Sequence, residues 1–81
     1  MNTNWNEENN TLVKTFTFAD FAEALAFVNH VGAIAQELQH HPDISIQNYN
    51  TVTTSTTTHD KGNTITEKDH QLIARIDAII V

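Results

Sequence analysis

Polar and apolar residues alternate along residues 11–18, near the start of the chain. The four positions on the more apolar side are Leu12, Lys14, Phe16 and Phe18. Alternation with a period of two is typical of a β-strand that buries one face. Asn9 and Asn10 favour a turn just before it, because asparagine tolerates positive φ. We therefore predict a hairpin, in which a short strand around Trp5 precedes the strand of residues 11–18.

A helical pattern follows the hairpin. Apolar residues recur at spacings of three and four, as on the buried stripe of an amphipathic helix. The stripe comprises Phe21, Ala24, Leu25, Val28, Val31, Ala35 and Leu38. Asp20 and Glu23 have the spacing of a capping box and predict the start of the helix. Pro42 cannot continue a helix, so this one should end near Gln39 or His40.

The region after this helix predicts two further strands. Residues 44–48 alternate between apolar and polar side chains, and residues 49–58 are rich in threonine and valine. Threonine is β-branched yet polar, which suits a strand with one face that is wet or meets another subunit. Asn48 and Asn50 are candidates for the turn between the two strands.

A second helical pattern completes the sequence after a loop at residues 60–63. Thr66 and Asp69 have the spacing of a helix N-terminus. The apolar stripe that follows comprises Leu72, Ile73, Ile76, Ile79 and Ile80. The order ββαββα predicts an α+β fold, in which a four-stranded antiparallel sheet carries two helices packed on one face. We expect residues 1–81 to form a single domain.

Composition narrows the class of protein. A core built from 81 residues gives marginal stability, so we expect a homodimer or homotetramer. The chain has no cysteine, which excludes disulfides and thiolate sites. A formal charge of −6 disfavours binding to nucleic acid and to anionic membranes. The N-terminus lacks the features of a signal peptide, and no apolar run approaches a membrane span, so we expect a soluble cytoplasmic protein.

Three of the five histidines lie where predicted elements end. His40 and His41 follow the first helix, and His59 follows the threonine-rich strand. Imidazole exchanges protons near neutral pH, because its unperturbed pKa is roughly 6.5. Taken alone, His-His-Pro is also a plausible polar helix end, which the helix dipole favours by roughly 0.3–1 kcal/mol. We assign His30 and His70 to solvated or boundary positions.

An antiparallel sheet covered by a helix can bring these chain ends to one edge of the domain. Asp69, in the first turn of the last helix, could reach the same edge and orient or charge an imidazole. Trp5 and Tyr49 could supply flat apolar walls for an aromatic ring system. The grouping predicts an acid–base site for an aromatic substrate.

The spacing of these residues is specific. Its parts are His40-His41-Pro42-Asp43, Tyr49, Thr58-His59-Asp60, Gly62, Thr66, Asp69 and Leu72-Ile73. The pattern resembles the pterin-4a-carbinolamine dehydratase family, from about Trp5 to the C-terminus. The resemblance implies elimination of water from a 4a-hydroxytetrahydropterin to give the quinonoid dihydropterin, as in tetrahydrobiopterin recycling, with no metal and no organic cofactor.

The resemblance also implies roles for individual residues. His40 and His59 would be general acids for departure of the hydroxyl group, and Asp69 would orient the histidines. His41 would mainly hold the pterin. The residues expected to contact the substrate are Trp5, His41, Pro42, Tyr49 and Thr58.

Two departures from the family pattern stand out. Gln36 occupies a position that is commonly acidic, which we expect to bear on the protonation of His40. The helix that many members carry before the tryptophan is expected to be absent, which leaves dimer and tetramer both open.

Two other functions fit parts of the pattern. Animal members of the family also serve as dimerisation partners of a homeodomain transcription factor, so the chain could be a non-catalytic interaction module with the threonine-rich strand as its edge. A three-histidine zinc site is the other alternative. It is disfavoured because the adjacent side chains of His40 and His41 diverge in an extended segment.

Overall fold

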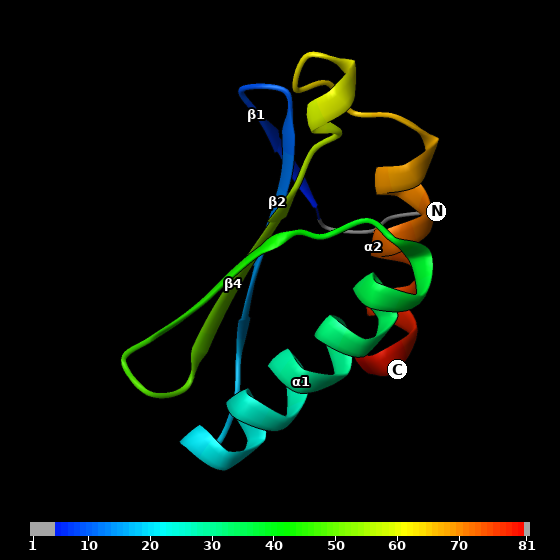
Figure 1. Cartoon of the computed structure of the whole chain (residues 1–81). Helices are drawn as coiled ribbons and strands as arrows, with labels where there is room; N and C mark the ends of the chain where they lie inside the picture. The colour runs from blue at the N-terminus through cyan, green and yellow to red at the C-terminus, as the bar shows by residue number, and fades with distance from the viewer. Residues whose placement is uncertain (1–4, 81) are drawn as a thin grey trace.

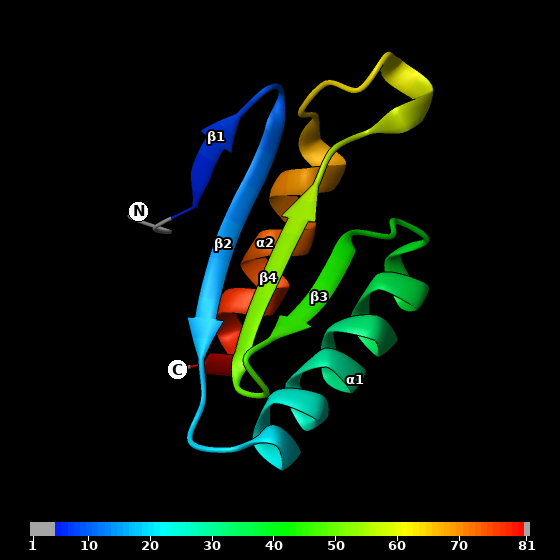
Figure 2. The same cartoon turned by 90° about the vertical axis from the view of Figure 1, so that its left-hand side faces the viewer.

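Four antiparallel strands form one sheet, and two helices cover one of its faces, in the computed structural model of the chain, which describes residues 5–80 (Figures 1 and 2). The strands are β1 (Asn6–Glu8), β2 (Thr11–Thr17), β3 (Asp43–Gln47) and β4 (Thr51–Thr56). The helices are α1 (Phe21–Leu38), α2 (Glu67–Ile80) and the short 3-10 helix η1 (His59–Lys61). The predicted ββαββα fold class is confirmed. Ile80 was predicted to belong to the apolar stripe of the last helix, and its side chain is not among those that the structure describes.

The strand order β1-β2-β4-β3 places β4 in the middle of the sheet. Tight turns close both hairpins. Asn9 and Asn10 have φ of 52° and 64°, which confirms the first predicted turn. In the β3–β4 turn the positive φ values belong to Asn48 (51°) and Tyr49 (58°). The strand after this turn therefore starts at Thr51, and our prediction that it starts at Tyr49 was wrong, because Gln47 pairs with Thr51 and the left-handed Asn48 and Tyr49 belong to the three-residue loop between them.

Helix α1 begins and ends as its sequence predicts. The Asp20 carboxylate accepts a hydrogen bond of 2.8 Å from the amide of Glu23, which caps the N-terminus. At the other end Gln39 has φ of 55°, and the amide of His40 donates to the carbonyl of Ala35 at 3.0 Å. This left-handed cap turns the chain sharply and places His40 directly beyond the helix.

The core lies between the sheet and the helices. Its buried members are Leu12, Phe16, Ala24, Phe27, Val31, Ile34, Ala35, Val52, Leu72, Ile73 and Ile76. The rings of Phe16 and Phe27 pack with their centroids 4.7 Å apart and tie β2 to α1. Among residues 5–80, no helix is long and apolar enough to cross a membrane.

The threonines of β4 and the segment that follows it divide between the two faces of the sheet. Thr51, Thr53, Ser55 and Thr57 lie on the face without helices and are partly exposed. Thr54, Thr56 and Thr58 lie on the helical face with Val52 and are almost fully buried. The predicted solvent-accessible face of this strand is therefore present, but half of the threonines lie on the opposite face, which packs against the helices.

Candidate active site

A buried hydrogen-bonded pair of an imidazole and a carboxylate joins the end of α1 to the start of α2. His40 follows α1 and is 9% exposed, while Asp69 lies in the first turn of α2 and is fully buried. The Nε2 atom of His40 lies 2.6 Å from Oδ1 of Asp69. A charge-assisted hydrogen bond of this length is strong, and a buried carboxylate needs such partners.

Three further donors surround the Asp69 carboxylate. The hydroxyl of Thr56 donates to Oδ1 at 2.6 Å. The hydroxyl of Thr58 and the amide of Thr66 donate to Oδ2 at 2.8 and 2.9 Å. An ionised carboxylate has about four acceptor sites. The four donors, counting His40, therefore fill the hydrogen-bonding capacity of this side chain.

The protonation of Asp69 follows from these contacts. Burial raises the pKa of the Asp69 carboxyl, but hydrogen bonds from His40, Thr56, the Thr66 amide and Thr58 lower it by more. The net result is a pKa below the ordinary value for aspartate, so Asp69 is anionic at neutral pH.

The anionic acceptor determines where His40 carries its proton. The ionised Asp69 can only accept a hydrogen bond, so Nε2 of His40 is the protonated nitrogen. Nδ1 is not used by this contact and can exchange a proton with a ligand. Within residues 5–80, Nδ1 has no hydrogen-bond partner, and the only buried side-chain polar atom without one is Oγ1 of Thr54. Nδ1 of His40 is therefore not fully enclosed, on a side chain that is 10% exposed.

His59 and His41 are exposed and are each held by an amide oxygen. Nδ1 of His59 lies 2.8 Å from Oδ1 of Asn63, so Nδ1 donates and Nε2 is free. Nε2 of His41 lies 3.0 Å from Oε1 of Gln36. Gln36 therefore contacts His41 and not His40, the residue whose protonation we expected it to influence, and the partner of His40 is a carboxylate from another element.

The histidines share one end of the molecule without touching each other. The α1–β3 connection, which holds His40 and His41, and η1, which starts with His59, both lie toward the upper right in Figure 2. Thr58 precedes His59 and binds the same carboxylate as His40. Within the described residues no group of three or more histidine, aspartate or glutamate side chains is arranged to hold a metal ion.

Two of the expected substrate contacts are placed differently. Thr58 is 1% exposed and its hydroxyl is committed to Asp69, so it is not free to bind a ligand. Tyr49 is 63% exposed at the β3–β4 turn, at the opposite end of that hairpin from the α1–β3 connection (Figure 2). Tyr49 therefore does not line the histidine site of its own chain.

Trp5 lies toward the far end of α2. Its Nε1 donates to both oxygens of Asp77, at 3.0 and 3.2 Å, and its ring meets Phe16 edge to face. Asp77 is eight residues beyond Asp69, which is about 12 Å along a helix. Pro42 is partly exposed beside His41. Trp5 and Pro42 remain candidates for substrate contacts, and Trp5 is not in contact with His40.

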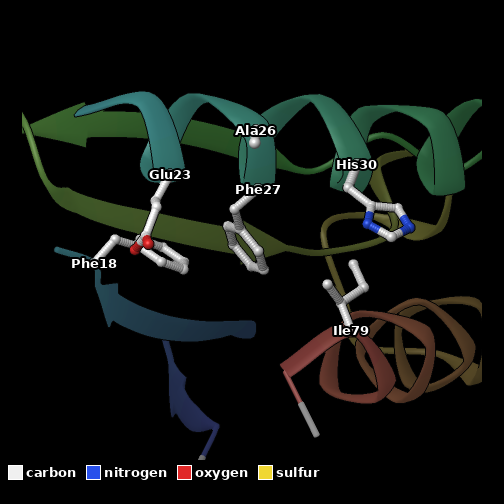
Figure 3. A pocket seen from close by; sticks show the side chains of 6 residues that line it. All are labelled: Phe18, Glu23, Ala26, Phe27, His30 and Ile79. Carbon is white, nitrogen blue, oxygen red and sulfur yellow. The ribbon is translucent and has the colours of Figure 1, made fainter. Parts of the chain in front are cut away.

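Neither hollow described on the surface is lined by His40, His41 or His59. A groove of about 480 Å³ between α1 and the end of α2 is lined by Phe18, Glu23, Ala26, Phe27, His30 and Ile79 (Figure 3). A second, of about 370 Å³, is lined by Leu38, Gln71, Ala74 and Arg75. The predicted solvated position of His30 is consistent with its exposure at the first groove, and His70 is exposed as well.

Sequence reasoning missed Thr56, which binds Asp69, and Asn63, which binds His59. Thr56 was detectable, because it stands four residues after the buried Val52 and alternation places both on one face of a strand. Asn63 carried no comparable signal, because its contact depends on the loop that η1 forms.

Comparisons with known proteins agree on one family. The profile of the family described as pterin 4 alpha carbinolamine dehydratase matches residues 1–79. A protein of Chloroflexus aurantiacus, provisionally named as such a dehydratase, is 51% identical over 94% of this chain and 80% of its own. A protein of Sulfolobus acidocaldarius with the same provisional name is 44% identical over 93% of this chain and 80% of its own.

Solved structures share the fold. A crystal structure from Brucella melitensis, described as a transcriptional coactivator/pterin dehydratase, has a TM-score of 0.83 and 30% identity, covering 93% of this chain and 80% of that one. A pterin dehydratase-like protein, described as a RuBisCO assembly factor in the alpha-carboxysome, has a TM-score of 0.75 and 26% identity, covering 91% of this chain and 86% of that one.

Proposed function

The chain belongs to the pterin-4a-carbinolamine dehydratase family, and we propose that it removes water from a 4a-hydroxytetrahydropterin to give the quinonoid dihydropterin, as in tetrahydrobiopterin recycling. The observation that carries this proposal is the buried His40–Asp69 pair, whose second imidazole nitrogen has no hydrogen-bond partner within residues 5–80. The pair supplies what the elimination needs, namely an oriented imidazole that can give and take a proton.

The reaction requires two proton movements. The C4a–O bond breaks while the N5 lone pair forms a C4a=N5 double bond, and the departing oxygen takes a proton and leaves as water. The N5 proton is then lost. A positioned general acid typically supplies about 10²–10⁴-fold of rate in such a step. In our proposal the imidazolium form of His59, through Nε2, or of His40, through Nδ1, gives this one proton to the oxygen, and the neutral imidazole that results can accept the N5 proton.

The remaining residues bind or position. His41 and Pro42 follow His40 at the exposed end of α1, so we propose that they hold the pterin ring. Trp5 is proposed as part of the pocket wall. The cytoplasmic location and a homodimeric or homotetrameric state stay predictions.

The direct test measures dehydration of a synthetic 4a-hydroxytetrahydropterin by stopped-flow absorbance. We expect acceleration over the spontaneous rate at pH 6–8, with no added metal and with no change in the presence of a chelator. Loss of activity on chelation would instead support a metal site. A folded protein with no acceleration across this pH range would contradict the proposed function.

A non-catalytic function is the second candidate. The neighbour described as a RuBisCO assembly factor shares this fold at a TM-score of 0.75, so the same scaffold is associated with assembly in another protein. An absence of catalysis together with stable capture of one defined partner protein would favour this alternative for the chain.

A further inference from the structure

Three threonines on the buried face of the β4 segment differ in what their hydroxyl groups do. Thr54, Thr56 and Thr58 are 0%, 2% and 1% exposed. A buried hydroxyl is unfavourable unless it is hydrogen-bonded. The hydroxyls of Thr56 and Thr58 bond to the Asp69 carboxylate, whereas Oγ1 of Thr54 has no partner within residues 5–80. All three threonines are therefore buried in the core, but only Thr56 and Thr58 contact Asp69.

Building on the dehydratase function above, we propose that Thr56 and Thr58 are positioning residues, which fix the Asp69 carboxylate so that His40 keeps its proton on Nε2 and directs Nδ1 to the substrate. The two hydroxyls reach opposite oxygens of the carboxylate, Oδ1 and Oδ2. A carboxylate that is held at both oxygens cannot rotate without breaking a hydrogen bond.

The direction of each hydrogen bond is defined by its partners. Thr58 donates to Asp69, so the 2.6 Å contact between Thr58 and Thr66 has the Thr66 hydroxyl as donor. Oγ1 of Thr66 in turn accepts from the amide of Lys68 at 3.3 Å. The hydroxyl chain therefore runs in one direction, from the first turn of α2 through Thr66 and Thr58 to Oδ2 of Asp69.

The filled carboxylate limits what Asp69 can do. With four donors in place, no acceptor site is left for a proton, so Asp69 orients His40 and does not take its proton. Proton exchange is then confined to Nδ1. Thr56 is the sensitive member, because it shares Oδ1 with His40, and both contacts are 2.6 Å long. Without its hydroxyl, Oδ1 would be free to shift toward water or toward the Thr58 side.

The chain contains its own control for this proposal. Thr56→Val removes the hydroxyl and keeps the shape, and Thr54→Val makes the same change two residues away on the same strand and face. Thr54 has no hydrogen bond to lose, so its variant should be as stable as the parent chain or more so. Thr56→Ser should restore the contact to Asp69.

The readout is the tautomer of His40 in the free protein, measured by long-range ¹H–¹⁵N NMR with ¹⁵N-labelled histidine. We expect one tautomer, protonated at Nε2, in the parent, Thr54→Val and Thr56→Ser proteins, and a mixture in Thr56→Val. For catalysis we expect Thr56→Val to lower kcat about tenfold, the equivalent of one net hydrogen bond, with a changed pH profile and little change in KM.

The outcomes separate this proposal from the proposed function. If Thr56→Val keeps the single tautomer and the pH profile of Thr54→Val, the positioning role is overturned even though dehydration is observed. If the parent protein does not accelerate dehydration, the function fails, and the NMR comparison still decides whether Thr56 fixes His40. Thr56→Ala removes the same hydroxyl with less bulk and replaces Thr56→Val if valine prevents folding.

Discussion

Single atoms on the three histidines decide what the site offers to a substrate. His40 and His41 each donate through Nε2, to a carboxylate and to an amide oxygen, and both leave Nδ1 free. His59 donates through Nδ1 to Asn63 and leaves Nε2 free. The free nitrogens therefore differ in their distance from the backbone, because Nε2 lies farther out on the ring than Nδ1. In our proposal the two acids therefore present different ring nitrogens to the substrate, Nε2 in His59 and Nδ1 in His40.

The first residue-level prediction separates catalysis from binding. We expect His59→Ala to lower kcat by about 10²-fold or more, because a general acid is lost, and His41→Ala mainly to raise KM. Steady-state kinetics over a range of pterin concentrations would measure both constants. Purely KM effects of equal size in both variants would contradict these roles.

Gln36 provides the second prediction at this scale. Gln36→Glu would place a carboxylate where an amide oxygen now meets His41 at 3.0 Å. A nearby negative charge favours the imidazolium form, by about 0.2–1 kcal/mol for an exposed pair. We therefore expect a larger protonated fraction of His41 at pH 7, measured by ¹⁵N NMR, with the His40 signals unchanged. A change at His40 instead would show that Gln36 acts on that residue.

At the scale of elements, the Asp69 carboxylate both caps the start of α2 and holds His40 of the candidate site. Asp69 accepts from the amide of Thr66, the spacing of a capping box at the start of α2, and also holds His40 beyond the end of α1. The cap was predictable, because Thr66 and Asp69 stand three residues apart in the sequence. The contact to His40 is not a local signal, because it depends on how two helices pack across the same sheet.

The double use of Asp69 predicts a large stability effect. Asp69→Asn would leave a buried amide among donors that need an acceptor, and we expect a loss of about 3–5 kcal/mol in the free energy of unfolding at pH 7. Urea denaturation followed by circular dichroism would measure it. A loss below about 1 kcal/mol would mean that the pair contributes little to folding.

The pH dependence of that stability has a defined sign. The pKa of Asp69 is lower in the folded protein than its ordinary value, so its ionised form favours folding. This contribution is complete above the unfolded pKa of about 3.9 and is lost as the pH falls through the lower, folded pKa. Repeating the denaturation from pH 7 to pH 2 should show the gap between parent and Asp69→Asn narrowing only below about pH 4. A gap that narrows between pH 7 and 5 would point to another group.

Some elements of this fold could be predicted from the sequence, and others could not. The helix start at Asp20 and the turn at Asn9 have local causes, a capping side chain and a left-handed backbone, so pattern sufficed. Tyr49 was misplaced because tyrosine is a strand former, and the geometry of the hairpin overrides that preference. Thr58 was expected to bind substrate, but its side-chain direction depends on the whole sheet.

At the scale of the molecule, the residue before β1 and a residue of β2 are both tied to α2. Asp77 of α2 accepts from the indole of Trp5 and forms an ion pair of 3.2 Å with Lys14 of β2. Asp77 is partly buried, with a side chain 23% exposed. These contacts close the domain across its full sequence length, because Trp5 and Asp77 are 72 residues apart.

We expect Asp77→Ala to reduce the free energy of unfolding by about 1–3 kcal/mol, because a part-buried hydrogen bond and ion pair are lost together. Glu37→Gln is the matched control, since the Glu37–Arg75 pair has a similar length of 2.9 Å but is exposed to solvent. No measurable change is expected there. Equal destabilisation of both variants in parallel urea titrations would contradict a special role for Asp77.

The position of Asp69 also matters during synthesis. A ribosome makes His40, Thr56 and Thr58 before it makes the Asp69 carboxylate that binds all three, because α2 follows them in the chain. A nascent chain released before α2 docks would carry every proposed proton donor, but His40 would have no fixed orientation. If the proposed function holds, we therefore expect dehydratase activity to appear only when α2 docks, because docking brings the carboxylate that orients His40.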